Sequence, residues 1–151
     1  MPNELTIRQG RREDVAGLYD LICELADFEH ARKEVTITME ELLEDGFGAK
    51  PRYRSLVAVE HDNVLAMALY YPRYSTWKGK TLYLEDLIVK REKRRKGIGH
   101  RLMKALIRQA KDQGYKRLEW QVLDWNDSAL EFYENFDVEI DKTWLNCRIA
   151  F

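Results

Sequence analysis

The chain has 151 residues, of which 45% are hydrophobic, and it carries 25 Lys and Arg side chains against 26 Asp and Glu. This length supports one domain with its own hydrophobic core, so we expect a single domain over residues 1–151. The formal net charge of −1 gives no overall attraction to nucleic acid or to anionic membranes, and any electrostatic function must be local.

The first half of the chain predicts two helices and three strands. Residues that alternate in polarity form the first strand, and apolar residues at helical spacing follow it. Thr38 and Glu41 have the spacing of a capping box at the start of the second helix. A strand pair rich in Val, Leu and Tyr then predicts a hairpin. The predicted elements are Leu5–Arg8, Arg11–Phe28, a helix from Thr38 to the glycines at 45–48, Ser55–Glu60 and Val64–Tyr71.

The second half alternates strands and helices. The longest helix is expected at Ile98–Gln113, where apolar residues recur every fourth position and Gly114 marks its end. The other expected elements are strands at Thr81–Val89, Leu118–Leu123 and Thr143–Ala150 and a short helix at Ser128–Phe136. This order predicts an α/β fold with a mixed sheet and helices on both faces.

The sequence offers no metal site and no membrane segment. Its two cysteines and three histidines are scattered, without the spacing of metal ligands, so we expect reduced thiols. The N-terminal segment lacks the apolar stretch of a secretory signal, and no apolar run approaches the roughly 20 residues that span a bilayer. We therefore expect a soluble cytoplasmic protein.

A basic, glycine-containing loop lies between the strand at 81–89 and the helix at 98–113. Gly97 and Gly99 allow close approach of a ligand to the backbone, and the helix start presents N–H groups and a positive dipole end to an anion such as pyrophosphate. Cationic side chains at 93–96 add charge. The alternatives are a solvated turn and a nucleic-acid patch. The position between strand and helix, and the lack of a wider basic excess, favour the anion site.

Two adjacent carboxylates, Glu85 and Asp86, interrupt the apolar strand LYLEDLIV. Alternation sends them to opposite faces, so at least one approaches a covered face unless the strand is bulged there. A buried carboxylate is costly without partners. For Asp86 alone a local salt bridge or a charge at the sheet edge is the better interpretation. We favour an active-site role for Glu85, because this strand leads directly into the anion loop.

The segment WNDSALEFY at 125–133 runs from a strand end into a short helix. Taken alone, Asn126 or Asp127 is an N-cap residue and Tyr133 is a core aromatic residue.

Taken together, these elements resemble the GNAT superfamily of N-acetyltransferases. Arg94, Gly97 and Gly99 match its cofactor loop, R/Q-x-x-G-x-G/A. The segments ELADFE, LLEDGFG, YYPRYSTWKGKTLYLEDL and VLDWN are similar, in the same order, to those of diamine acetyltransferases. STWKG and LDWN are most similar to the branch that acetylates thialysine, a lysine analogue. The resemblance implies a central, mostly antiparallel sheet with helices on both faces.

The resemblance also implies an activity, which is transfer of acetyl from acetyl-CoA to a small amine by direct attack in a homodimer without metal. Tyr133 would protonate the leaving CoA thiolate, and Asn126 would contact the cofactor beside it. Backbone groups at 87–89 would meet the pantetheine and the acetyl carbonyl. The implied cofactor set is Leu87, Ile88, Val89, Arg94, Arg95, Lys96, Gly97, Ile98, Gly99, His100 and Asn126, and the implied amine-site set is Phe28, Glu29, Trp77, Glu85 and Asp86.

Substrate preference follows from charge. Glu29 and Glu85 would attract an ammonium group, and Glu85 is expected to anchor it and pass its proton through water. Arg32 and Lys33 would repel a long polyamine and meet an α-carboxylate, which favours a short diamine or a lysine-like zwitterion. The rival functions are acetylation of a peptide or protein amine, and a non-catalytic module that binds CoA or nucleic acid.

Overall fold

The computed structural model describes residues 4–151, and its contacts divide the chain into two compact units, Met1–Trp120 and Gln121–Phe151. The first unit contains a five-stranded sheet in the order β1-β2-β3-β4-β5. All neighbouring strands are antiparallel except β4 and β5, which are parallel. The strands are β1 (Thr6–Gln9), β2 (Arg54–Glu60), β3 (Asn63–Ser75), β4 (Gly79–Val89) and β5 (Arg117–Glu119).

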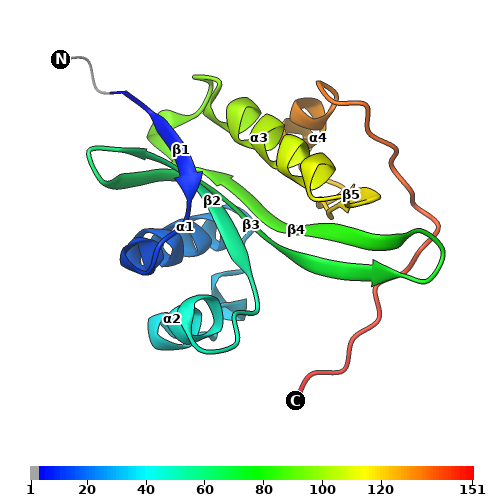
Figure 1. Ribbon diagram of the computed structural model, residues 1–151, viewed down its shortest axis with the longest axis horizontal. Helices are drawn as coiled ribbons and strands as arrows, with labels where there is room; N and C mark the ends of the chain where they lie inside the picture. Colours follow the sequence, from blue (N-terminus) through cyan, green and yellow to red (C-terminus); the bar gives the residue numbers. More distant parts are fainter. Residues whose placement is uncertain (1–3) are drawn as a thin grey trace. The chain divides into compact units, whose positions relative to one another are not determined.

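Helices cover both faces of this sheet (Figure 1). Helices α1 (Val15–Phe28) and α2 (Met39–Phe47) lie on one side, and α3 (Ile98–Asp112) lies on the other and contacts β2, β3 and β4. The predicted mixed α/β fold with a mostly antiparallel sheet is confirmed. The face under α1 and α2 holds a cluster of ten buried residues that includes Leu18, Met67 and Ile88, and Leu102 and Leu106 of α3 are fully buried.

Local sequence explains where these helices start and stop. The Thr38 hydroxyl accepts a hydrogen bond from the Glu41 amide at 3.1 Å, as the capping-box spacing predicts. Helix α3 begins after Gly97, with φ of 78°, and is followed by Gly114, with φ of 77°. Such left-handed conformations suit glycine.

The second unit contains α4 (Asp127–Tyr133) but no strand among its residues. The predicted strand at Thr143–Ala150 is therefore wrong, and the one predicted at Leu118–Leu123 is shortened to Arg117–Glu119. Alternating apolar residues are suited to a strand, but a strand forms only where a neighbouring backbone accepts and donates its hydrogen bonds. Gln121 Nε2 donates to Asn146 Oδ1 at 2.6 Å within this unit, but this bond joins two side chains and is not part of a backbone ladder.

Candidate active site

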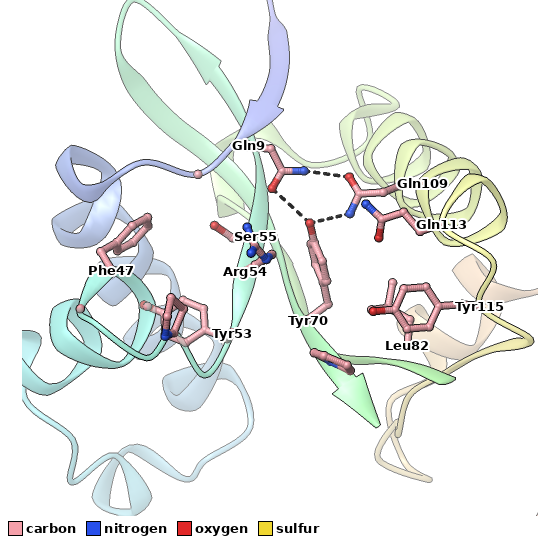
Figure 2. A pocket seen from close by; sticks show the side chains of 15 residues that line it. Gln9, Phe47, Tyr53, Arg54, Ser55, Tyr70, Leu82, Gln109, Gln113 and Tyr115 are labelled. Carbon is pink, nitrogen blue, oxygen red and sulfur yellow. Dashed lines mark hydrogen bonds between the residues drawn. The ribbon is translucent and has the colours of Figure 1, made fainter. Parts of the chain in front are cut away.

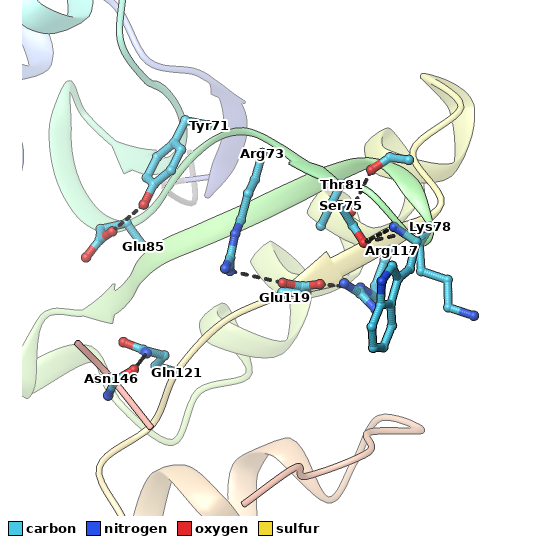
Figure 3. A network of polar contacts seen from close by, with 12 residues as sticks. Tyr71, Arg73, Ser75, Lys78, Thr81, Glu85, Arg117, Glu119, Gln121 and Asn146 are labelled. Carbon is cyan, nitrogen blue, oxygen red and sulfur yellow. Dashed lines mark hydrogen bonds and ion pairs between the residues drawn. The ribbon is translucent and has the colours of Figure 1, made fainter. Parts of the chain in front are cut away.

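A β-bulge sets the positions of the two strand carboxylates. Leu69 on β3 pairs with Asp86, whereas Tyr70 pairs with Leu84, so Glu85 is the extra residue of β4. The bulge breaks the alternation. Glu85 is exposed and its Oε1 accepts a hydrogen bond from the Tyr71 hydroxyl at 2.8 Å (Figure 3), while Asp86 is largely buried.

Asp86 lies in a cluster of three carboxylates with Glu85 and with Glu29, which caps the C-terminal end of α1. Burial raises the pKa of Asp86 to about 7, and the charges of Glu85 and Glu29 add to this effect. Burial also raises the pKa of Glu29. Within residues 4–151 no lysine or arginine forms an ion pair with any of the three. The salt bridge considered for Asp86 is therefore absent from the described chain, and the uncompensated negative charge suits a cationic ligand.

The predicted anion loop joins β4 to α3. Arg95 and Gly97 have positive φ angles of 62° and 78°. The Arg101 amide donates to the Gly97 carbonyl at 3.1 Å, so the amides that precede Arg101 in the first helical turn have no partner inside the helix. A Cβ atom built on Gly97 meets no atom within 4 Å. The loop therefore offers backbone N–H groups and open space at a helix N-terminus.

Arg94 anchors this loop to the rest of the first unit. Its Nε donates to the Val89 carbonyl at 3.1 Å, and its guanidinium carbon lies 5.6 Å from the centre of the Phe28 ring. The contact joins the end of α1, and with it Phe28 and Glu29, to the loop. Arg95 and Lys96 remain exposed.

The edge of β4 that faces β5 is open next to the carboxylates. β5 pairs only with Thr81–Tyr83, and in the described part of the first unit no strand pairs with this edge farther along. The backbone from Leu84 to Val89 thus presents polar groups between the carboxylate cluster and the glycine loop. This edge, the loop, Glu85 and Asp86 lie on one stretch of chain, and Glu29 approaches them from the end of α1. Together they could hold an anionic ligand and an amine near each other.

The other predicted site residues belong to other elements of the chain. Trp77 is 81% exposed at the turn between β3 and β4, which is roughly 20 Å of strand away from Glu85. In the second unit, the Asn126 side chain caps α4 by accepting from the Ala129 amide at 3.2 Å, as its N-cap interpretation predicts. Tyr133 is the last residue of α4, with its ring centre 5.3 Å from that of Phe132.

Four residues beside the cluster were not singled out from the sequence: Tyr71, Arg73, Tyr83 and Glu119. The rings of Tyr71 and Tyr83 lie 5.4 Å apart, and the Arg73 guanidinium is 5.2 Å from the Tyr83 ring centre. Arg73 Nη1 is also 3.1 Å from a carboxylate oxygen of Glu119 (Figure 3). Strand alternation is the sequence signal that could have found the two residues on β3: Tyr71 and Arg73 are two apart, and residues two apart on a strand share a face of the sheet.

A separate cavity of about 760 Å³ lies in the first unit and is lined by none of the predicted site residues. Figure 2 shows a triangle of hydrogen bonds within it: the Tyr70 hydroxyl accepts from Gln109 at 2.6 Å and donates to Gln9 at 3.2 Å, and Gln9 donates to Gln109 at 2.8 Å. These three groups satisfy one another. The lining also contains the cationic Arg54 and the buried Ser55 hydroxyl, which has no hydrogen-bond partner, but no carboxylate cluster that would hold an amine.

Comparison with known proteins shows the family of this chain. The Acetyltransferase (GNAT) family matches residues 16–137, and the chain belongs to this family. It is therefore an acetyltransferase, and members of the family use acetyl-CoA. Within the family it is similar to thialysine N-epsilon-acetyltransferases, with 40% identity to the Bos taurus protein (85% of this chain, 80% of the relative) and 37% to the Caenorhabditis elegans protein (87% and 83%).

A solved structure also shares the fold. An aminoglycoside N-acetyltransferase in complex with CoA superposes with a TM-score of 0.79 at 16% identity, over 100% of this chain and 98% of that protein. Among the described residues, none of the helices combines the length and apolar character needed to span a membrane, and no three His, Cys, Asp or Glu side chains, the three carboxylates included, are placed so that they could hold a metal ion.

Proposed function

We propose that this acetyltransferase transfers the acetyl group of acetyl-CoA to a primary amine of a small diamine, polyamine or lysine-like amino acid. The observation that carries the proposal is the carboxylate cluster at Glu29, Glu85 and Asp86 beside the β4 edge, with which no lysine or arginine of residues 4–151 forms an ion pair. Similarity to thialysine acetyltransferases over most of the chain supports the same substrate class.

The chemistry requires removal of a proton from the substrate. An alkyl ammonium has a pKa near ~10.4, so supplying the neutral amine at neutral pH costs about 4–5 kcal/mol. In our proposal, Glu85 anchors the ammonium, and the proton passes through water to Glu85 or to Asp86, whose pKa of about 7 makes it the better acceptor. The amine nitrogen then bonds to the acetyl carbon.

The remaining groups act on the thioester. Backbone groups at Leu87–Val89 would stabilise the oxyanion that forms on the carbonyl. The carbon–sulfur bond breaks, and Tyr133, by the family resemblance, would donate a proton to the departing thiolate while Asn126 contacts the cofactor. In the loop at 94–100, the N–H groups of the first helical turn and the side chains of Arg95 and Lys96 would bind the pyrophosphate.

We further propose a cytoplasmic homodimer. Two free cysteines, Cys23 and Cys147, suit a reducing compartment. A second subunit would account for Trp77, whose place at the hairpin turn is far from Glu85 in its own chain but would allow it to line the amine site of a partner. Phe28 and Glu29 would line that site from the same chain.

Changing Gly97 to alanine is expected to weaken acetyl-CoA binding about tenfold or more, measured by calorimetric titration. The added methyl group would occupy the open space beside the helix N-terminus, where a phosphate must approach the backbone. The strain of the left-handed conformation should lower the free energy of unfolding by about 1–2 kcal/mol.

Gly114→Ala is the matched control, because Gly114 has nearly the same φ angle and equally open surroundings at the other end of α3. It should cost similar stability and leave acetyl-CoA affinity unchanged. Equal affinities in the two variants would contradict binding at the Gly97 loop, and wild-type protein that binds no CoA would contradict the proposed function as a whole.

A substrate panel tests the amine class. With thialysine, lysine, ornithine, putrescine and spermidine as acceptors, we expect kcat/KM to be highest for a short or lysine-like amine, because spermidine places additional charge near Arg32 and Lys33. A strong preference for spermidine would contradict this order. If the protein acetylates peptide amines but none of these small amines, the alternative function, acetylation of a peptide or protein amine, would be favoured.

A further inference from the structure

The surface next to the carboxylate cluster carries an arginine that is available to a ligand. Tyr71 and Arg73 on β3, Tyr83 on β4 and Glu119 on β5 form a continuous strip that begins at Glu85. Figure 3 shows Tyr71, Arg73 and Glu119 of this strip. We call its four residues the Arg73 strip. It lies entirely within the first unit, so its geometry does not depend on the second.

The two ends of this surface have opposite charge. Three carboxylates lie at the Glu85 end. At the far end, Arg73 and Arg117 both pair with Glu119, which leaves one excess positive charge. The Arg73 side chain is 57% exposed, and a guanidinium has five N–H donors, of which the structure pairs one, on Nη1, with Glu119. Arg73 thus retains donors that can bind a second carboxylate.

We propose that Arg73 binds the α-carboxylate of a lysine-like amino acid while its side-chain ammonium is held at Glu85 and Asp86. This inference rests on the proposed acetyltransferase function and assigns the substrate's second functional group. The residue is a determinant of specificity and not a catalytic group.

The Cα spacing along β3 is close to the length of a lysine side chain. Tyr71 donates a hydrogen bond to Glu85. It lies two residues from Arg73 on β3, so the Cα atoms of Tyr71 and Arg73 are about 6.6 Å apart. Five bonds of about 1.5 Å each join Cα of lysine to its side-chain nitrogen, an extended length of roughly 6 Å. The Tyr71 and Tyr83 rings between the two ends provide an apolar wall for the methylene chain.

Tyr71 is suited to that position by its protonation. Burial and the adjacent Glu85 raise the pKa of the Tyr71 hydroxyl above its usual value. The hydroxyl therefore remains a donor to Glu85 and holds the carboxylate at the end of the strip where the ammonium is expected.

Three amine acceptors of similar chain length separate the contribution of the substrate's carboxylate from that of its amines. Lysine carries both end groups, 6-aminohexanoic acid retains the carboxylate without the α-amine, and 1,5-diaminopentane has no carboxylate. Arg73→Gln should lower kcat/KM for lysine and 6-aminohexanoic acid about tenfold relative to 1,5-diaminopentane, mainly through KM. Arg73→Glu should shift the ratio further toward the diamine, a gain that general damage to the fold cannot produce.

Arg108→Gln serves as the matched control, since Arg108 is exposed on α3. This variant should leave kcat/KM for all three acceptors unchanged. An equal loss on all three acceptors in the Arg73 variants would overturn the inference. So would a loss of carboxylate selectivity in Arg32→Gln with none in Arg73→Gln, because the carboxylate would then lie at the end of α1. If wild-type protein acetylates none of the acceptors and no other amine, the proposed function itself fails.

Discussion

Replacing Tyr133 with phenylalanine is expected to lower kcat about 100-fold or more while acetyl-CoA affinity changes little. The hydroxyl acts only when the thiolate leaves, so its removal affects the transition state and not the ground state, and general acid catalysis contributes roughly 10²–10⁴-fold. Single-turnover acetylation and calorimetric titration of acetyl-CoA measure the two quantities separately.

Phe132→Leu is the neighbouring control, because it alters the aromatic contact of Tyr133 and leaves the hydroxyl. It should reduce kcat much less than Tyr133→Phe. Turnover that is unchanged in Tyr133→Phe when chemistry limits the rate would remove Tyr133 from the acid role and would leave the amine site untouched.

Asp86→Asn is expected to make the protein more stable above pH 7 and nearly inactive. The pKa of Asp86 is raised from 3.8 to about 7, so between these values the folded protein holds a proton that the unfolded chain has released. Wild-type stability attributable to this group is fully present below pH ~4 and is lost as pH rises through about 7, by an amount on the order of a few kcal/mol. Asparagine does not ionise, so the Asp86→Asn variant does not lose stability as the pH rises.

Activity should change in the opposite direction. If Asp86 accepts the substrate proton, the wild-type pH profile of kcat/KM should rise through an ionisation with a pKa near 7. The Asp86→Asn variant should lack this ionisation, and its kcat/KM should be about 100-fold lower than that of the wild type. Urea unfolding at pH 5 and pH 8 and a pH–rate profile test both halves. Asp112→Asn, at an exposed position in α3, should alter neither. Stability of Asp86→Asn that matches wild type at pH 8 would contradict the burial argument.

A more stable but inactive variant would mean that the fold tolerates an unfavourable charge for the sake of the reaction. The unfavourable terms are identifiable: burial of Asp86 and its repulsion by Glu85 and Glu29. A cationic substrate would relieve them when it binds, so bound amine should protect the wild-type protein against unfolding more than the variant.

The sequence alone determined the elements whose signals are local. The glycines at 97 and 114 mark the ends of α3, and Thr38 caps α2, because these effects involve only neighbouring backbone groups. The glycine loop between a strand and a helix was predicted for the same reason. The family also followed from motifs within short stretches, and the comparisons confirm it.

Tertiary structure alone decided which carboxylate is buried and what surrounds it. Alternation could not choose between Glu85 and Asp86, because the register shift opposite Leu69 and Tyr70 depends on how β3 pairs with β4. Arg73 and Glu119 are 46 residues apart in sequence, so only the pairing of three strands brings them beside Glu85. The strand predicted at 143–150 failed for the same reason: its side-chain pattern is local, but its hydrogen-bond partners must come from elsewhere.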